Sequence, residues 1–227
     1  MIKAKSRIWG ALLALLLAFA MVACSTPATS SNAAQSGTGA VQAQYDSDDA
    51  DASWSEENAT AVIVLNGDSI EISGQGATAD GATLTIKEEG LYVLSGTLND
   101  GQVIVNAAST ATVRIVLNGV DITSNTSAAI YAPQSDKLVI TLAEGTQNTV
   151  TDAAHYTYAD TEAEEPDAAI FAKDDLTING SGSLTVNANF KNGIGTKDDL
   201  VIVSGTYNIT AANDGMRGRD SVTVLDG

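Results

Sequence analysis

Aspartate residues recur at regular intervals in the second half of this sequence. Pairs of them open two neighbouring strand-like segments, and an aspartate followed by a serine opens the next. If equivalent residues stack on one another, their like charges repel unless a cation or a basic neighbour compensates them. Calcium binds about six to eight oxygen ligands, so stacked carboxylates are candidate calcium ligands. The residues concerned are Asp174, Asp175, Asp198, Asp199 and Asp220.

The same pattern has a second interpretation that needs no metal. Lys173, Lys197 and Arg219 recur directly before the aspartates, so a mixed ladder of opposite charges would also neutralise the column. Aspartate side chains serve as turn residues as well. A separate corner contains Asn192 and Asp214, which we regard as a second candidate calcium site. Neither set has the spacing of an EF-hand or of the glycine-rich calcium repeats.

Other side chains offer less chemistry. Tyr131 and Phe171 hold equivalent outward places, where they would form a sugar-stacking platform unless residues 147–167 fold over them. Arg217 differs in type from Phe171 and Gly195, the residues at equivalent positions. It lies near Asp214 in the sequence, as the basic residue of a calcium-dependent lyase lies near a carboxylate. A guanidinium rarely loses its proton, however, so Arg217 is a poor base. The sequence contains one histidine, so histidine triads and zinc clusters are unsupported. We expect no catalysis.

These residues belong to an internal repeat that must position them. Ile170, Ile194 and Met216 hold the same place in successive units, at intervals of 24 and 22 residues, and Ile130 holds that place in a looser copy. Between Ile130 and Ile170 the interval is 40 residues, and the surplus falls in residues 147–167. Repeat proteins place such insertions in loops on one face, which is often a binding face.

Each unit has the pattern of short β-strands. Apolar residues alternate with other side chains, and Gly and Asn mark the turns. The pattern predicts an all-β domain of stacked coils, a parallel β-helix or β-solenoid that is truncated at its C-terminal end. A β-sandwich also has short strands, but it does not explain the fixed place of the Lys/Arg-Asp pairs. The buried columns would be Leu176, Leu200 and Val222, and Ile178, Ile202 and Val224.

The N-terminal part reads as an export signal. Three basic residues precede an apolar run over residues 8–23, and Met-Val-Ala-Cys at 21–24 resembles a lipobox. We therefore expect residues 1–23 to be a signal peptide and Cys24, the only cysteine, to be lipidated, with an ordinary signal peptide as the alternative. Residues 24–58 would be a flexible acidic linker, and residues 59–227 the β-helix domain.

Charge limits the partners. The formal net charge of −17 argues against nucleic acid and anionic membrane surfaces, and it permits neutral sugars and cations. We expect a protein on the outside of the cell membrane or in the periplasm, held to the membrane by its lipid alone.

Several segments resemble a family of bacterial carbohydrate-binding lipoproteins. They are the run GLYVLSGTLNDGQVIV at 90–105, VLNGVDIT at 116–123, and the Lys-Asp-Asp-Leu units at 173–176 and 197–200. The resemblance implies a right-handed parallel β-helix of the pectate-lyase type that binds calcium and cellulose-like or pectin-like polysaccharide. We therefore expect a polysaccharide-binding module. The alternatives are a calcium-dependent polysaccharide lyase and a non-catalytic surface adhesin or spacer.

Overall fold

The computed structural model describes residues 45–158 and 164–227, which belong to one compact unit. Cys24, the predicted signal peptide and most of the predicted linker lie outside the described residues. Two short helical elements, α1 (Ser47–Ala50) and η1 (Glu56–Asn58), precede the strands. The predicted all-β class is confirmed. The strands are β1 (Ala61–Gly67), β2 (Ile70–Gly74), β3 (Ala77–Asp80), β4 (Thr83–Ile86), β5 (Gly90–Leu98), β6 (Gln102–Asn106), β7 (Thr112–Thr123), β8 (Ile130–Gln134), β9 (Lys137–Leu142), β10 (Gln147–Thr151), β11 (Ala168–Ala172), β12 (Asp175–Gly180), β13 (Ser183–Ala188), β14 (Asn192–Thr196), β15 (Asp199–Ile202), β16 (Thr206–Ala211), β17 (Met216–Gly218) and β18 (Ser221–Val224).

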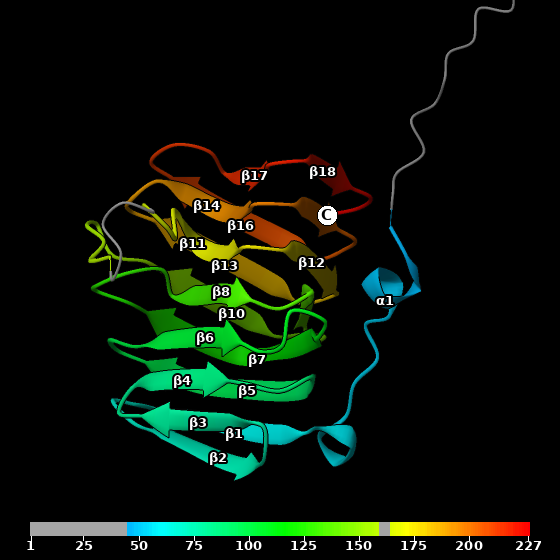
Figure 1. Ribbon diagram of the computed structural model, residues 1–227, viewed down its shortest axis with the longest axis vertical. Coiled ribbons are helices and arrows are strands. Elements are labelled where there is room, and N and C mark those ends of the chain that lie inside the picture. The colour runs from blue at the N-terminus through cyan, green and yellow to red at the C-terminus, as the bar shows by residue number, and fades with distance from the viewer. Residues whose placement is uncertain (1–44, 159–163) are drawn as a thin grey trace, which may run out of the picture. The chain divides into compact units, whose positions relative to one another are not determined.

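Two open sheets contain these strands (Figure 1). The larger sheet has the order β16-β13-β10-β7-β9-β12-β15-β18, and β5, β1 and β2 join it through β7. The smaller sheet has the order β17-β14-β11-β8-β6-β4-β3. Pairing is parallel except for the antiparallel pairs β1–β2 and β3–β4. Strands distant in the sequence therefore lie side by side.

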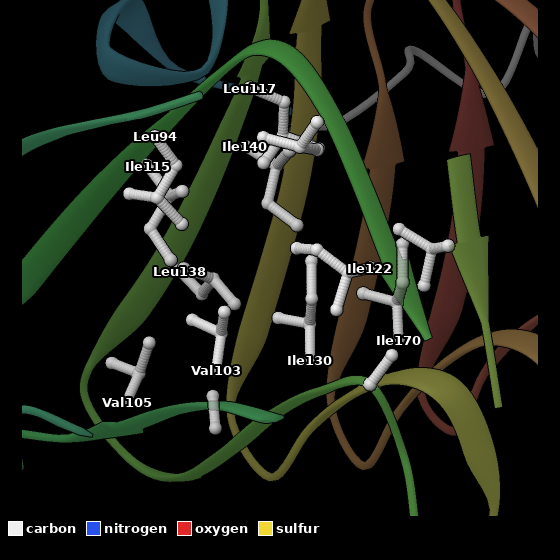
Figure 2. Packing of buried hydrophobic residues seen from close by; sticks show 14 of the residues in the cluster. Leu94, Val103, Val105, Ile115, Leu117, Ile122, Ile130, Leu138, Ile140 and Ile170 are labelled. Carbon is white, nitrogen blue, oxygen red and sulfur yellow. The ribbon is translucent and has the colours of Figure 1, made fainter. Parts of the chain in front are cut away.

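The register pairs residues that the sequence places at equivalent positions. Ile194 lies between Ile170 and Met216 in the smaller sheet, and Ile170 also pairs with Ile130. In the larger sheet Leu200 lies between Leu176 and Val222. Inward side chains from both sheets build one apolar core, part of which Figure 2 shows. Burying a large aliphatic side chain of this kind stabilises a fold by roughly 1.5–3 kcal/mol.

The predicted burial is wrong at the end of each column. Leu176 and Leu200 are buried, but Val222 is 45% exposed and Val224 is 59% exposed. Among the described strands, β18 pairs with β15 alone. One side of β18 therefore has no neighbour to cover it, and its side chains remain in contact with solvent.

Residues 45–58, which the sequence assigned to the flexible linker, instead pack on the outer face of the larger sheet. We call this segment the N-terminal strap. Asp49 is 2% exposed, and its backbone oxygen accepts a hydrogen bond from Nδ2 of Asn179 at 2.8 Å. Farther along, Trp54 packs against Val93 and Val116. The linker prediction was wrong here because a sheet with apolar side chains on its outer face needs a cover.

Within residues 45–158 and 164–227, no helix is long and apolar enough to cross a membrane.

Candidate functional site

Three of the predicted aspartates come together where β12 and β15 begin. Carboxylate oxygens of Asp175, Asp198 and Asp199 all lie within 4.8 Å of one another, and each residue is half-buried. We call these three residues the acidic cluster. The parallel pairing of β12 with β15 brings them together, because Leu176 and Leu200, the residues that follow, are direct partners. The backbone N–H of Asp199 also donates to Oδ1 of Asp175 at 3.4 Å.

The environment of the acidic cluster disfavours its negative charge. Burial raises the pKa of Asp198, and the charges of Asp220, Asp199 and Asp174 raise it further. Burial also raises the pKa of Asp175, and the nearby charge of Asp198 adds to the rise. Both shifts mean that the folded protein pays a cost to keep these groups ionised. A bound cation would remove that cost.

The mixed ladder of charges, the second interpretation of this pattern, does not form as ion pairs among the described residues. Lys173 and Lys197 form ion pairs with Glu165, with Nζ–Oε distances of 3.3 and 2.5 Å. Within the described part of the chain, no lysine or arginine nitrogen lies within 4.0 Å of a carboxylate oxygen of the acidic cluster. The lysines are drawn to the segment that precedes β11, and the aspartates remain without a cationic partner at that distance.

Asp174 and Asp220 flank the acidic cluster. Asp174 precedes Asp175 in the chain, and the backbone N–H of Asp220 donates to the backbone oxygen of Asp198 at 3.2 Å. Each carboxylate offers two oxygens, so the three residues of the cluster supply a set of hard oxygen ligands of the type that calcium prefers. The donor set contains neither nitrogen nor sulfur, which suits calcium better than zinc or copper.

The second predicted calcium corner is not part of this cluster. Asn192 is 1% exposed, and its Nδ2 donates to the backbone oxygen of Asp167 at 3.0 Å. Its Oδ1 accepts hydrogen bonds from Nδ2 of Asn213 and from the backbone N–H of Asp214. Both ends of the Asn192 amide are therefore used inside the fold. Its assignment as a ligand-binding residue is wrong, and Asp214 lies exposed beside it.

Phe171 and Arg217 also occupy different roles from those predicted, whereas the prediction for Tyr131 stays open. Phe171 is 1% exposed, so its ring cannot be a sugar-stacking platform, and the ring centre of Tyr131 lies 6.0 Å from it. Tyr131 is half-buried and lines a cavity. Nη1 of Arg217 pairs with Oδ2 of Asp167 at 3.1 Å. Asp167, which directly precedes β11, therefore contacts β17 of the smaller sheet.

A cavity of about 260 Å³ opens beside the acidic cluster. Its walls come from the strap, through Tyr45, Asp46 and Asp49, and from the larger sheet, through Lys137, Thr177 and Val201 as well as Asp175 and Asp199. Sequence reasoning missed the strap residues and Lys137. One signal was available, because residues 138–142 of β9 form a nearly continuous apolar run, which is typical of a strand covered on both faces.

Comparison with known proteins gives three findings. Residues 80–227 match the family model of carbohydrate-binding domain-containing proteins. A carbohydrate-binding domain-containing protein of Acetivibrio thermocellus is 41% identical over 152 residues, which cover 66% of this chain and 53% of the relative. This chain therefore spans about half the length of that relative. A solved structure, the gadolinium derivative of a polysaccharide lyase-like protein from C. thermocellum, is 42% identical with a TM-score of 0.71, covering 73% of this chain and 67% of that one.

Proposed function

We propose, since this chain belongs to the family of carbohydrate-binding domain-containing proteins, that it is a surface module which binds polysaccharide with the help of calcium. The observation that carries the proposal is the acidic cluster of Asp175, Asp198 and Asp199. Its carboxylates crowd within 4.8 Å without a cationic side chain within 4.0 Å in the described part of the chain. Such a group is costly unless it holds a cation.

The proposed role of calcium is to join two sets of carboxylates. A calcium ion on the acidic cluster would compensate the repulsion between the aspartates and keep coordination positions for oxygens of a ligand. A pectin-like chain carries carboxylates, and this protein has a net charge of −17, so the two repel each other without calcium. A cellulose-like chain is neutral and needs no bridging ion. Pectin binding is therefore expected to require calcium, and cellulose binding is not.

For the architecture, we propose that the stacked coils wind as a right-handed parallel β-helix. The parallel pairing of β5-β7-β9-β12-β15-β18 and of β4-β6-β8-β11-β14-β17 supports this winding. The lyase-like structural neighbour supports it as well. A rigid face of stacked strands suits an extended polymer.

We propose that the module binds without catalysis. Arg217 is the side chain nearest in type to a lyase base, but it pairs with Asp167 and keeps its proton. His155 is exposed. The alternative of a calcium-dependent lyase draws support from the name of the structural neighbour, a polysaccharide lyase-like protein. Incubation with polygalacturonate separates the two, because a lyase forms an unsaturated product that absorbs in the ultraviolet.

The location proposed is the outer side of the cell membrane or the periplasm, with a lipid on Cys24 as the anchor. The support comes from the signal-like residues 1–23 and the lipobox-like residues 21–24. Cys24→Ala is then expected to move the protein from the membrane fraction to the soluble fraction. An unchanged membrane fraction would rule out the lipid anchor.

The decisive experiment measures binding to polygalacturonate and to insoluble cellulose, each with calcium and with chelator. Asp198→Asn is expected to weaken calcium-dependent binding to polygalacturonate at least about tenfold, which corresponds to about 1.4 kcal/mol. Asp214→Asn is the matched control, because it removes the same charge from an exposed aspartate outside the cluster. Equal losses in both variants would point to general charge and not to a site. If neither polymer binds, a surface spacer or adhesin becomes the better account.

A further inference from the structure

A second cavity lies on the outer face of the smaller sheet. It has a volume of about 550 Å³, within the range of roughly 300–1,000 Å³ that is usual for small-molecule sites. One wall comes from strands β6 and β8 and from Lys173, which follows β11, and the other comes from residues on either side of the undescribed stretch 159–163. The residues that matter for the argument are Gln102, Ile104, Tyr131, Tyr158, Glu165 and Lys173.

The apolar part of this cavity is built around one aromatic ring. Tyr131 pairs with Ile104 on one side and with Phe171 on the other in the register of the smaller sheet. Phe171 is buried and its ring centre lies 6.0 Å from that of Tyr131, so it supports the tyrosine ring from within the fold. The ring of Tyr131 is thereby fixed by its neighbours before any ligand arrives. A fixed aromatic surface binds at a low cost in conformational entropy.

The polar part of the cavity combines donors and acceptors. Nε2 of Gln102 donates to the backbone oxygen of Ala128 at 2.6 Å, which fixes the position of its amide. The hydroxyl of Tyr158 is buried, so this residue contributes to the wall and offers no polar contact. Glu165 and Lys173 form an ion pair with an Nζ–Oε2 distance of 3.3 Å. The amide of Gln102, the carboxylate of Glu165 and the ammonium group of Lys173 match the hydroxyls of a sugar, which donate and accept at the same time.

The charge of the cavity selects the kind of sugar. Its lining carries Glu165 and Lys173, and Glu165 pairs with Lys197 as well as with Lys173. A uronic acid would bring a second carboxylate next to Glu165, which already holds both ammonium groups. A neutral pyranose avoids that repulsion, and its apolar faces can lie against the ring of Tyr131.

We propose that this cavity is a subsite for a neutral pyranose, separate from the acidic cluster and independent of calcium. The subsite rests on the proposed function, because it is a second contact for the same class of polymer. It assigns the neutral part of a glycan to the smaller sheet and the charged part to the acidic cluster. A mixed glycan would then contact both regions.

The test uses cellotetraose as the probe in the presence of chelator, with binding measured by calorimetry. Tyr131→Ala is expected to weaken binding about tenfold. Tyr131→Phe keeps the ring and is expected to change the affinity by less than about threefold. Thr126→Trp places a bulky side chain at an exposed position on the wall and is expected to block binding without removing a core contact. Tyr45→Ala is the control, because this exposed tyrosine lies at the other cavity.

The outcomes distinguish the subsite from the proposed function. Loss of cellotetraose binding in Tyr131→Ala and Thr126→Trp, with unchanged circular dichroism and unchanged calcium-dependent binding to polygalacturonate, supports the subsite. Unchanged cellotetraose binding in both variants overturns the subsite and leaves the proposed function intact. Absence of cellotetraose binding in the unmodified protein also overturns it. Absence of polygalacturonate binding in the unmodified protein contradicts the proposed function. That result is independent of the cellotetraose measurement, which tests the subsite.

Discussion

Lys137 and the acidic cluster are neighbours on the same sheet, yet their charges are handled in opposite ways. Lys137 is the register partner of Asp175 across β9 and β12. Its Nζ lies 2.9 Å from oxygens of Asp46 and Asp49, so the strap compensates its charge. Asp175 has Asp198 and Asp199 beside it, and the charge of Lys137 offsets only part of the rise in its pKa. The strap therefore compensates the lysine through direct ion pairs, whereas the three aspartates have no cationic side chain within 4.0 Å among the described residues.

The contrast is also visible in the pKa values. Hydrogen bonding to Lys137 lowers the pKa of Asp46, whereas burial raises the pKa of Asp175. A carboxylate whose pKa is lowered by folding stabilises the protein at pH values above the pKa that the group has in the unfolded chain. That stability is lost as the pH falls through the pKa of the folded state. A raised carboxylate pKa has the opposite sign, because it costs stability at neutral pH and the cost disappears as the group is protonated.

The largest effect is expected from Asp49→Ala. This change removes a carboxylate that is 2% exposed and that accepts hydrogen bonds from Lys137 and from the hydroxyl of Thr177 at 2.5 Å. Loss of one partner of a buried pair costs about 3 kcal/mol of unfolding free energy. Urea denaturation measures it, with Asp48→Ala, an exposed aspartate in the same helix, as the control. Equal midpoints for the two variants would show that the strap contributes little to stability.

The next effect concerns calcium. At about a hundred times its Kd, calcium is expected to stabilise the unmodified protein by about 2.7 kcal/mol, measured as a shift of the melting midpoint. Asp198→Asn is expected to lose most of this increment. With chelator the same variant should be more stable than the unmodified protein by roughly 0.5 kcal/mol, because one of several like charges is gone. A calcium response that survives in Asp198→Asn would place the ion elsewhere.

A smaller effect is expected from pH in the presence of chelator. The pKa of Asp198 is raised by burial and by neighbouring aspartates, so the folded protein takes up a proton there at a higher pH than the unfolded chain. The advantage of Asp198→Asn should therefore be greatest at neutral pH and shrink as the pH falls through the raised pKa toward 3.8. Melting curves at several pH values measure this difference. If the stability difference between Asp198→Asn and the unmodified protein did not change with pH, repulsion between the aspartates would not be its cause.

The smallest effect is expected from Glu165→Gln, which weakens two ion pairs on the smaller sheet. The side chains of Lys173 and Lys197 are 40% and 36% exposed, so water and salt already screen these pairs. The expected loss is about 0.5 kcal/mol, and it should decrease further in high salt. Urea denaturation at two salt concentrations measures it. A loss as large as that of Asp49→Ala would show that solvent does not weaken these pairs relative to the buried pair of Lys137 and Asp49.

The features of this molecule that could be predicted from the sequence are those set by the internal repeat. The intervals between Ile170, Ile194 and Met216 predict which side chains face one another, and the pairs of aspartates follow from the same intervals. The strap could not be predicted in this way. Its acidic composition is typical of a solvated linker, and its structure depends on a lysine 88 positions later. Asn192 was misassigned because an amide at a turn looks the same in sequence whether it is exposed or fully hydrogen-bonded.

The strap also constrains the order in which the chain can fold. Stacked coils can form one after another, because each contacts its immediate neighbours. The strap breaks this rule, since Thr177 and Asn179 contact Asp49 across sequence separations of 128 and 130 residues. Synthesis on the ribosome delivers residues 45–58 before β12, which follows more than a hundred residues later. The strap must therefore wait for its docking face, and its docking closes a loop around the strands between Ala61 and Gly180.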